Sequence, residues 1–371
     1  MGNTTNAGNT RRSEEASLAR LEEVLAEVLP GSQLRVLERA HGEAIRRSDL
    51  EVEFNGVRLL VDFLESTSRV RLADTAEILR RECEAYDCTP VLAATYLSPS
   101  KQELLRGLRT AFLDLAGNAW IVAPGIHIDR RGFPNRDKEP RERRDIYSDK
   151  ATLVLRVLLT RQKALGVREI AAIVRESAGG VGLSPGYVSK VAAELERRGY
   201  AGRRGDKVLL RHGPELLADW VAAYRSRRKP KNRGYFLPSP EAEALLPSLA
   251  PAFDEADLKY VFTGHAGASL VARFALFDVV DVYVKDAESA DGVLTRMGAR
   301  EVERGANVMV GLPHYLNSGF FDYQIPKPGM RAASDIQLYL DLYDHPVRGR
   351  EQAGHLYERQ LARLVEREGS L

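Results

Sequence analysis

The predicted fold of the middle of the chain depends on residues 184–200, which read SPGYVSKVAAELERRGY. Ser184 followed by Pro185 is a typical helix start, because the serine oxygen accepts from a free backbone N–H and proline fixes φ without losing a needed donor. Apolar residues then recur with helical spacing and give one buried face: Val188, Val191, Ala192 and Leu195. Gly199 is a typical residue just past a helix end. The stretch therefore predicts a capped amphipathic helix.

The opposite face of this helix is polar near its N-terminus, where it carries Ser184, Tyr187, Ser189 and Lys190. This is the end that a recognition helix inserts into the major groove of DNA. The segment that follows predicts a short hairpin with Gly205 at its tip and three cations beside it: Arg203, Arg204 and Lys207. Such a hairpin is a wing, whose cations reach phosphates or the minor groove.

Two further helices are predicted upstream, over Ala151–Lys163 and Val167–Ser177. The order helix, helix, capped helix, basic hairpin is that of a complete winged helix-turn-helix. We therefore expect residues 149–226 to bind double-stranded DNA, as a homodimer that reads two half-sites. The alternative is a three-helix core that mediates protein contacts only.

Positive charge is concentrated beside the expected wing. Residues 196–233 carry net +8, which leaves −6 for the remainder of a chain whose net charge is only +2. The basic segment includes Arg227, Arg228, Lys229 and Lys231, which we expect to add salt-dependent affinity for phosphate. The protein as a whole is not a polycation.

Composition excludes several classes of protein. The 371 residues are 44% hydrophobic and 29% charged, as in an ordinary globular protein of two or three domains. Cys83 and Cys88 are too few for a disulfide scaffold and are not spaced as a zinc site, so no metal or cofactor is expected. No apolar run is long enough for a membrane helix. Residues 1–16 are polar and predict a disordered leader without a signal peptide, so we expect a cytoplasmic, bacterial protein that associates with the nucleoid when bound to DNA.

The region before the winged helix predicts an α/β domain over 17–128. Helices are expected at Leu18–Leu29 and Leu34–Arg47, and Asn55-Gly56 predicts a hairpin between strands at Leu50–Phe54 and Arg58–Leu64. Alternating helices and strands follow. This order resembles the restriction-endonuclease-like PD-(D/E)xK superfamily, with Asp49 at the first acidic position. The (D/E)-x-K triplet falls on Asp62-Phe63-Leu64, so leucine stands where the resemblance requires lysine. We expect a degenerate domain that lacks the cation needed to orient water.

Two blocks in this first region, Pro90–Pro99 and Phe112–Ile121, resemble another family. They are similar to the AbiEi-like antitoxins of type IV toxin–antitoxin systems. Asp114 and Asn118 flank a turn there and are expected mainly to stabilise it. Two C-terminal blocks, Ala333–Tyr343 and His345–Ala353, show the same resemblance. It implies a transcription regulator, an autorepressor encoded beside a nucleotidyltransferase-type toxin.

The last region, 235–371, predicts an α/β domain of nucleotidyltransferase-like type. The run Tyr260–Ser269 is a strand that enters a glycine-rich turn, as in folds that bind a triphosphate. Catalysis there needs two carboxylates on the next strand at positions x and x+2, whereas Asp278 and Asp281 are three apart. We therefore expect no catalysis, and we expect His265 to be structural.

Together these patterns predict an α/β multidomain protein that is not an enzyme. We expect a charged connector over 129–148 and a basic hinge over 227–234 between its domains. The leading hypothesis is a sequence-specific transcriptional repressor of the antitoxin type. The alternatives are a DNA nuclease that the winged helix targets to its site, and an adaptor that binds protein partners.

Overall fold

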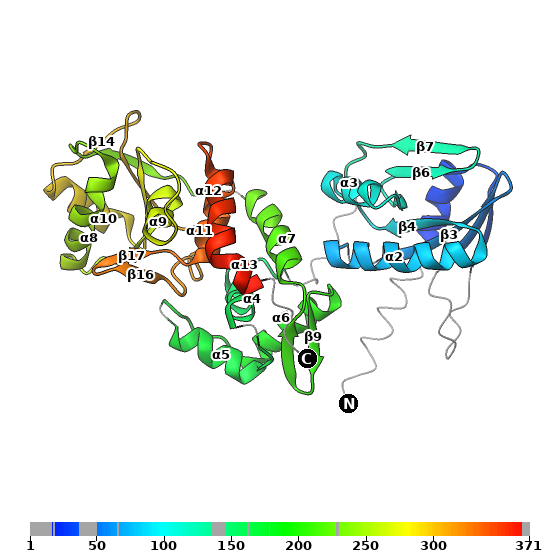
Figure 1. Cartoon of the computed structure of the whole chain (residues 1–371), viewed down its shortest axis with the longest axis horizontal. Coiled ribbons are helices and arrows are strands. Elements are labelled where there is room, and N and C mark those ends of the chain that lie inside the picture. The colour runs from blue at the N-terminus through cyan, green and yellow to red at the C-terminus, as the bar shows by residue number, and fades with distance from the viewer. Residues whose placement is uncertain are drawn as a thin grey trace. The chain divides into compact units, whose positions relative to one another are not determined.

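The computed structural model describes residues 17, 19–36, 50–64, 67–135, 145–161, 163–177, 179–227 and 230–365 (Figure 1). Contacts within the chain divide it into two compact units, residues 1–143 with 197–199 and residues 144–196 with 200–371. Both units are mixed α/β structures, as expected. The expected leader 1–16 lies outside the described residues, as do Asp49, Arg228 and Lys229.

The first unit is built on a seven-stranded sheet whose strands follow one another in chain order. Its strands are β1 (Gln33–Val36), β2 (Leu50–Phe54), β3 (Val57–Leu64), β4 (Thr89–Ala94), β5 (Ala111–Asp114), β6 (Ala119–Ala123) and β7 (Ile126–Arg130). The first three are antiparallel, β3, β4 and β5 run parallel, and β5, β6 and β7 are again antiparallel.

Helices cover both faces of this sheet. Residues 19–28 are helical, and their apolar side chains pack with one face of the strands. The other face is covered by α2 (Arg69–Tyr86) and α3 (Pro99–Gly107), which run along the sheet in Figure 1. The result is a three-layer sandwich in which each apolar stripe of a helix is buried against a sheet.

The Asn55-Gly56 hairpin is confirmed, because both residues have positive φ (51° and 76°) between β2 and β3. The helix expected at Leu34–Arg47 is wrong over its described part. Leu34 lies in β1, where it pairs with Val52 of β2, so an available sheet edge overrides a local helical pattern. The sequence also gave no indication of β7, which extends past the expected domain boundary at 128 to Arg130.

Asp114 and Asn118 stabilise a turn, as expected. The buried Asp114 carboxylate accepts from the backbone N–H groups of Leu97, Ala116 and Asn118 and from the Asn118 amide. Asn118 in turn binds the backbone of Phe133 in both directions, with a donor–acceptor distance of 3.0 Å each.

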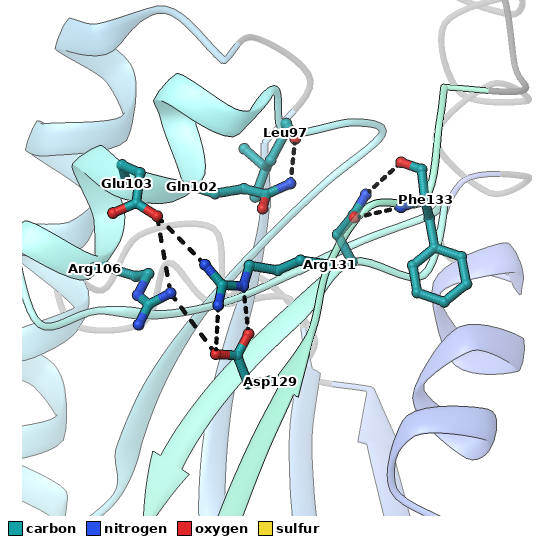
Figure 2. A network of polar contacts seen from close by, with 8 residues as sticks. Leu97, Gln102, Glu103, Arg106, Asp129, Arg131 and Phe133 are labelled. Carbon is teal, nitrogen blue, oxygen red and sulfur yellow. Dashed lines mark hydrogen bonds and ion pairs between the residues drawn. The ribbon is translucent and has the colours of Figure 1, made fainter.

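Beside this turn, Figure 2 shows a second polar group, in which Arg106 and Arg131 contact both Glu103 and Asp129. These ion pairs join α3 to the end of the β6–β7 hairpin. Arg106 also lies over the ring of Trp120, 5.4 Å from its centroid. The polar side chains of this part of the first unit are thus engaged with one another and with the backbone, as expected of structural groups.

The second unit contains, apart from residues 197–199, a segment that we call the helix–hairpin module, residues 149–225. It contains α4 (Asp149–Arg161), β8 (Leu165–Gly166), α5 (Val167–Glu176), α6 (Pro185–Arg197), β9 (Ala201–Arg204), β10 (Lys207–Leu210) and α7 (Gly213–Arg225). The hairpin β9–β10 is joined by β8 into a three-stranded antiparallel sheet with β10 in the centre. The helices and the hairpin match the expectations, and β8 was not predicted.

The rest of the second unit surrounds another seven-stranded sheet, of order β14-β11-β15-β13-β12-β17-β16. Its strands are β11 (Arg233–Phe236), β12 (Tyr260–Thr263), β13 (Val280–Val284), β14 (Arg300–Glu301), β15 (Val308–Gly311), β16 (Gln324–Lys327) and β17 (Met330–Ala332). Because β11 pairs with β14 and β15, the last two residues of the expected hinge, 233 and 234, belong to this sheet.

This C-terminal sheet is also covered on both faces. Its helices are η1 (Ala242–Leu245, 3-10), α8 (Leu246–Glu255), α9 (Gly264–Val271), α10 (Ala287–Arg296), α11 (Asp335–Leu342), α12 (Gly349–Leu356), η2 (Tyr357–Leu361, π) and α13 (Ala362–Val365). One core lies under η1, α8 and α10, and the other under α9, α11 and α12. Figure 1 shows α11 and α12 between the C-terminal sheet and the helix–hairpin module.

Candidate nucleic-acid interface

The N-terminus of α6 presents the polar residues that the sequence singles out. The Ser184 hydroxyl accepts from the backbone N–H of Tyr187 at 3.2 Å, so its oxygen is used as a helix cap. Lys190 is exposed, and Tyr187 and Ser189 are half-buried. The exposed cation and the two hydroxyl groups therefore stand on the surface of the helix while Val188, Val191 and Leu195 are fully buried.

The three cations of the hairpin have different surroundings. The Arg203 side chain is held against α6, with its Nε 2.7 Å from the Oε1 of Glu196. Arg204 and Lys207 are exposed at the tip. Within the part of the chain that the structure describes, no carboxylate pairs with either of them. The hairpin thus offers two uncompensated cations and a third that is tethered to the neighbouring helix.

A cation that sequence reasoning missed lies at the base of the hairpin. Arg211 is exposed, and its guanidinium lies on the backbone of Gly202, where an added Cβ would be 2.6 Å from the arginine Nε. A glycine inside a strand often marks such a close approach, so Gly202 was the available signal. Arg211 adds a positive group to the same hairpin.

The expected basic hinge is only partly described. Arg227 forms an ion pair with Asp145, so its charge is compensated inside the second unit. Lys231 is exposed. Of the four cations expected to add affinity there, one is thus a structural partner and one is accessible, while the other two lie outside the described residues.

A buried arginine fixes the first helix of the module to the C-terminal part. Arg156 of α4 is 1% exposed, and its guanidinium donates to Ser334 Oγ at 3.0 Å and to Gln337 Oε1 at 2.6 Å. Its Cζ also lies 5.2 Å from the centroid of the Trp220 ring. Burial lowers the pKa of Arg156 to about 10. Polar groups therefore join α4, α7 and α11 inside the unit.

The loop between β15 and β16 docks on the helix–hairpin module. Asp149 at the start of α4 accepts from the backbone N–H groups of Asn317 and Ser318. The carbonyl of Phe320 meets the turn between α5 and α6, where a Cβ on Gly179 would lie 2.1 Å from its oxygen. This loop therefore contacts both α4 and the turn between α5 and α6.

The glycine-rich turn of the C-terminal sheet lies beside a cavity of about 200 Å³. Asp281 of β13 enters this cavity, whereas Asp278 is exposed and precedes the strand. Two residues further along β13 stands Tyr283, so a phenol occupies position x+2. The carboxylate that comes near Asp281 is Asp341 of α11, and burial together with Asp341 raises the pKa of Asp281 to about 7.

Asp341 is engaged as an acceptor. It binds the hydroxyl groups of Thr263, Tyr224 and Tyr283 and the amide of Gln337. The neighbouring His265 is 95% buried, its Nε2 donates to the carbonyl of Val347 at 2.8 Å, and its ring packs edge-on against His345, consistent with a structural role. The paired acids that nucleotidyl transfer requires on one strand are therefore replaced by an aspartate and a tyrosine.

The structure describes one of the two acids expected of a nuclease-like motif in the first unit. Asp62 lies on β3 and lines a cavity of about 480 Å³ together with Asp74 and Glu77 of α2. Leu64 ends the same strand, at the position where the resemblance to nucleases requires lysine. Asp49, the other acid of the expected motif, lies outside the described residues. Among the residues that the structure describes, no group of three or more His, Cys, Asp or Glu is arranged to hold a metal ion.

None of the described helices is both long and apolar enough to cross a membrane.

Comparison with known families gives a match in the C-terminal part of the chain. Residues 209–362 match the family described as transcriptional regulator, AbiEi antitoxin, type IV TA system. The match confirms the AbiEi-like resemblance of the two C-terminal blocks, 333–343 and 345–353, whereas the blocks 90–99 and 112–121 lie outside the matched residues. It begins in β10, so most of the helix–hairpin module precedes it. Neither the curated proteins nor the solved structures gave a match.

Proposed function

We propose that the helix–hairpin module is a winged helix-turn-helix that binds double-stranded DNA, and that the chain is a transcriptional regulator. The observation that carries the proposal is a set of exposed cations that pair with no carboxylate among the described residues, Lys190 on α6 and Arg204 and Lys207 on the hairpin. They lie on the two elements that enter or flank a DNA groove in this class of module. The matched family of regulators supports the same role.

Within this proposal, the contacts of each residue suggest a division of roles. Ser184 is used for capping and Arg203 is held by Glu196, so we assign base reading to Tyr187, Ser189 and Lys190. Phosphate contacts fall to Arg204, Lys207 and Arg211, whose charges are exposed. Lys231 extends the same basic surface and adds affinity without sequence preference.

The experiment starts from DNA selected by the purified full chain from a random double-stranded pool. Affinity for the selected site is then measured by fluorescence anisotropy at several salt concentrations. Replacing both Arg204 and Lys207 with Ala should lower the slope of log affinity against log salt by about 2, since each phosphate contact contributes about 0.9. The matched control is Arg300→Ala, an exposed arginine of β14 outside the module, which should leave the slope unchanged.

If the double variant and the control lower the salt slope equally, the hairpin does not contact DNA phosphates. A pool that yields no enriched sequence would refute sequence-specific binding.

The biological role that we propose is autorepression in the manner of an antitoxin. Two copies of the chain would read two half-sites, and a nucleotidyltransferase-type toxin would be the operon partner. A reporter driven by the promoter of the chain's own gene should be repressed by the wild-type chain but not by the Arg204→Ala, Lys207→Ala variant. Sedimentation of the chain with its selected DNA should give two chains per site, and one chain per site would contradict the dimer.

A further inference from the structure

The two cysteines of the chain meet where α2 ends. Cys83 lies in the last turn of this helix, and Cys88 directly precedes β4. Between them Asp87 has a left-handed backbone (φ 50°, ψ 63°), and the backbone N–H of Cys88 donates to the carbonyl of Cys83 at 3.2 Å. This is a Schellman helix end, in which the chain folds back and the side chains at these two positions commonly contact each other. The backbone therefore brings the two thiols together.

The two thiols differ in accessibility and in acidity. Burial raises the pKa of both. Their mutual hydrogen bond raises the pKa of Cys83 further and offsets part of the rise at Cys88, so the thiol of Cys83 donates and the sulfur of Cys88 accepts. Cys83 is 4% exposed, whereas Cys88 is half-buried. Cys88 is therefore the thiol that ionises first and that a reagent from solvent can reach.

Charged side chains of three elements act on the pair. The positive charge of Arg58 on β3 favours the thiolate of both cysteines, whereas Glu51 of β2 and Glu82 of α2 oppose ionisation of Cys88. Arg58 is itself paired with Glu51, at 3.8 Å. The pKa of Cys88 stays above its ordinary value, because burial outweighs the favourable contacts. The thiolate is thus the minor form at neutral pH, and its reactions are slow there.

We propose that Cys83 and Cys88 form a reversible disulfide by exchange with a small-molecule disulfide such as oxidised glutathione. The Cys88 thiolate attacks one sulfur of the reagent, so a mixed disulfide forms at Cys88 and one reagent thiolate leaves. Cys83 then gives up its proton, its sulfur attacks that of Cys88, and the second reagent thiolate leaves. Each departing thiolate takes up one proton, so two protein thiols are oxidised while the reagent disulfide is reduced to two thiols.

The contact between the two thiols determines the product. Because the resolving thiol of Cys83 is held against Cys88, the second step is intramolecular and needs no approach from solvent. The mixed disulfide is therefore short-lived, and the product closes a short loop from the last turn of α2 to the residue before β4. Such a pair is a site of reversible modification and not a structural scaffold. It belongs to the first unit, whereas the proposed DNA contacts belong to the second.

The test exposes the reduced full chain to oxidised glutathione and maps the cysteine peptides by mass spectrometry without a reducing agent. We expect an internal link between Cys83 and Cys88, a chain lighter by two hydrogens, and no stable glutathione adduct. The rate should rise about tenfold per pH unit between about pH 7 and 8, because only the thiolate attacks. Added dithiothreitol should return both thiols.

Two matched variants separate the roles of the cysteines. Cys83→Ala removes the resolving thiol, so a glutathione adduct should accumulate on Cys88. Cys88→Ala leaves only the buried thiol, so its reaction should be at least about tenfold slower than that of the wild type. In urea Cys83 is no longer buried, and the Cys88→Ala chain should then react as fast as the Cys83→Ala chain does in the same urea.

Three results with the wild-type chain would overturn the proposal. These are a lasting glutathione adduct on Cys88, a disulfide between two chains, and a folded chain that stays reduced up to about pH 9 while its unfolded form reacts. Equal rates for the two folded alanine variants would refute Cys88 as the point of attack. The peptide map of the wild type requires no substitution, so it decides the matter even if a variant fails to fold.

Discussion

Replacing the buried Arg156 with methionine should change the free energy of unfolding of the second unit by less than about 1.5 kcal/mol. Arg156→Ala should instead lower it by about 3 kcal/mol, because truncation leaves a cavity between α4, α7 and α11. Methionine keeps most of the side-chain volume and removes only the charge. The comparison of the two variants therefore separates packing from the electrostatics of the guanidinium.

The magnitude follows from opposing contributions around this side chain. Burial lowers the pKa of Arg156 to about 10, so keeping the charge in the fold costs about 3 kcal/mol. Its Nε has no hydrogen-bond partner within the described residues, which costs about 1–3 kcal/mol more. Hydrogen bonds to Ser334 and Gln337 return about 1.5–3 kcal/mol each, and the Trp220 ring about 2 kcal/mol. The contributions nearly cancel.

Denaturant unfolding of the full chain measures this effect. The chain has two tryptophans, and a Trp120→Phe background leaves Trp220, which contacts Arg156, to report on the second unit. Unfolding curves of the two Arg156 variants are compared with the background at equal slope. If methionine proves as destabilising as alanine, the guanidinium makes a net stabilising contribution, and the near balance between its burial cost and its contacts is refuted.

Three further predictions concern other contacts of the second unit. Gly179→Ala should lower the free energy of unfolding of the second unit by about 2 kcal/mol or more, because the new Cβ meets the Phe320 carbonyl and the residue has a positive φ. Gly182→Ala, whose Cβ meets no atom within 4 Å, should be nearly neutral in the same denaturation assay. Glu196→Gln should release Arg203 and steepen the salt dependence of DNA binding by up to about 0.9, and an unchanged slope would show that Arg203 does not reach phosphate. The pKa of Asp281 is raised to about 7, so the folded chain holds the proton of this carboxyl more tightly than the unfolded chain does. The contribution of Asp281 to stability therefore declines as the pH rises from about 4 to 7. Asp281→Asn should therefore be more stable than the wild type at pH 8 and equal to it near pH 4, whereas Asp278→Asn, at an exposed position, should show no such pH-dependent gain.

Features that depend on neighbouring residues were predictable from the sequence. The start of α6 follows from Ser184-Pro185, and the β2–β3 turn from Asn55-Gly56, because caps and tight turns are set by a few consecutive residues. The positions of α4, α5, α6 and the β9–β10 hairpin were therefore expected. Their polar surface was visible as well, since exposed cations occur at positions that the apolar pattern leaves free.

Features that depend on distant residues were not predictable. Arg156 finds its partners 178 and 181 positions later, and Asp341 approaches Asp281 from another element. A pattern read along the chain cannot tell that Glu196 compensates Arg203 or that Asp145 compensates Arg227. The sequence thus identified the cations of the candidate interface other than Arg211, but only the folded chain shows which of them are already paired.

The fit of Gly179 against Phe320, together with the buried polar layer around Arg156, limits how this protein can be re-engineered. A foreign winged helix grafted in place of residues 149–225 would bring a different turn and would leave Ser334, Gln337 and Asn317 facing unmatched groups. The helix–hairpin module therefore cannot be exchanged as an independent unit. Under the proposed DNA-binding function, a change of target sequence is better sought by exchanging single solvent-facing residues such as Lys190, which leaves the contacts with the C-terminal part of the chain intact.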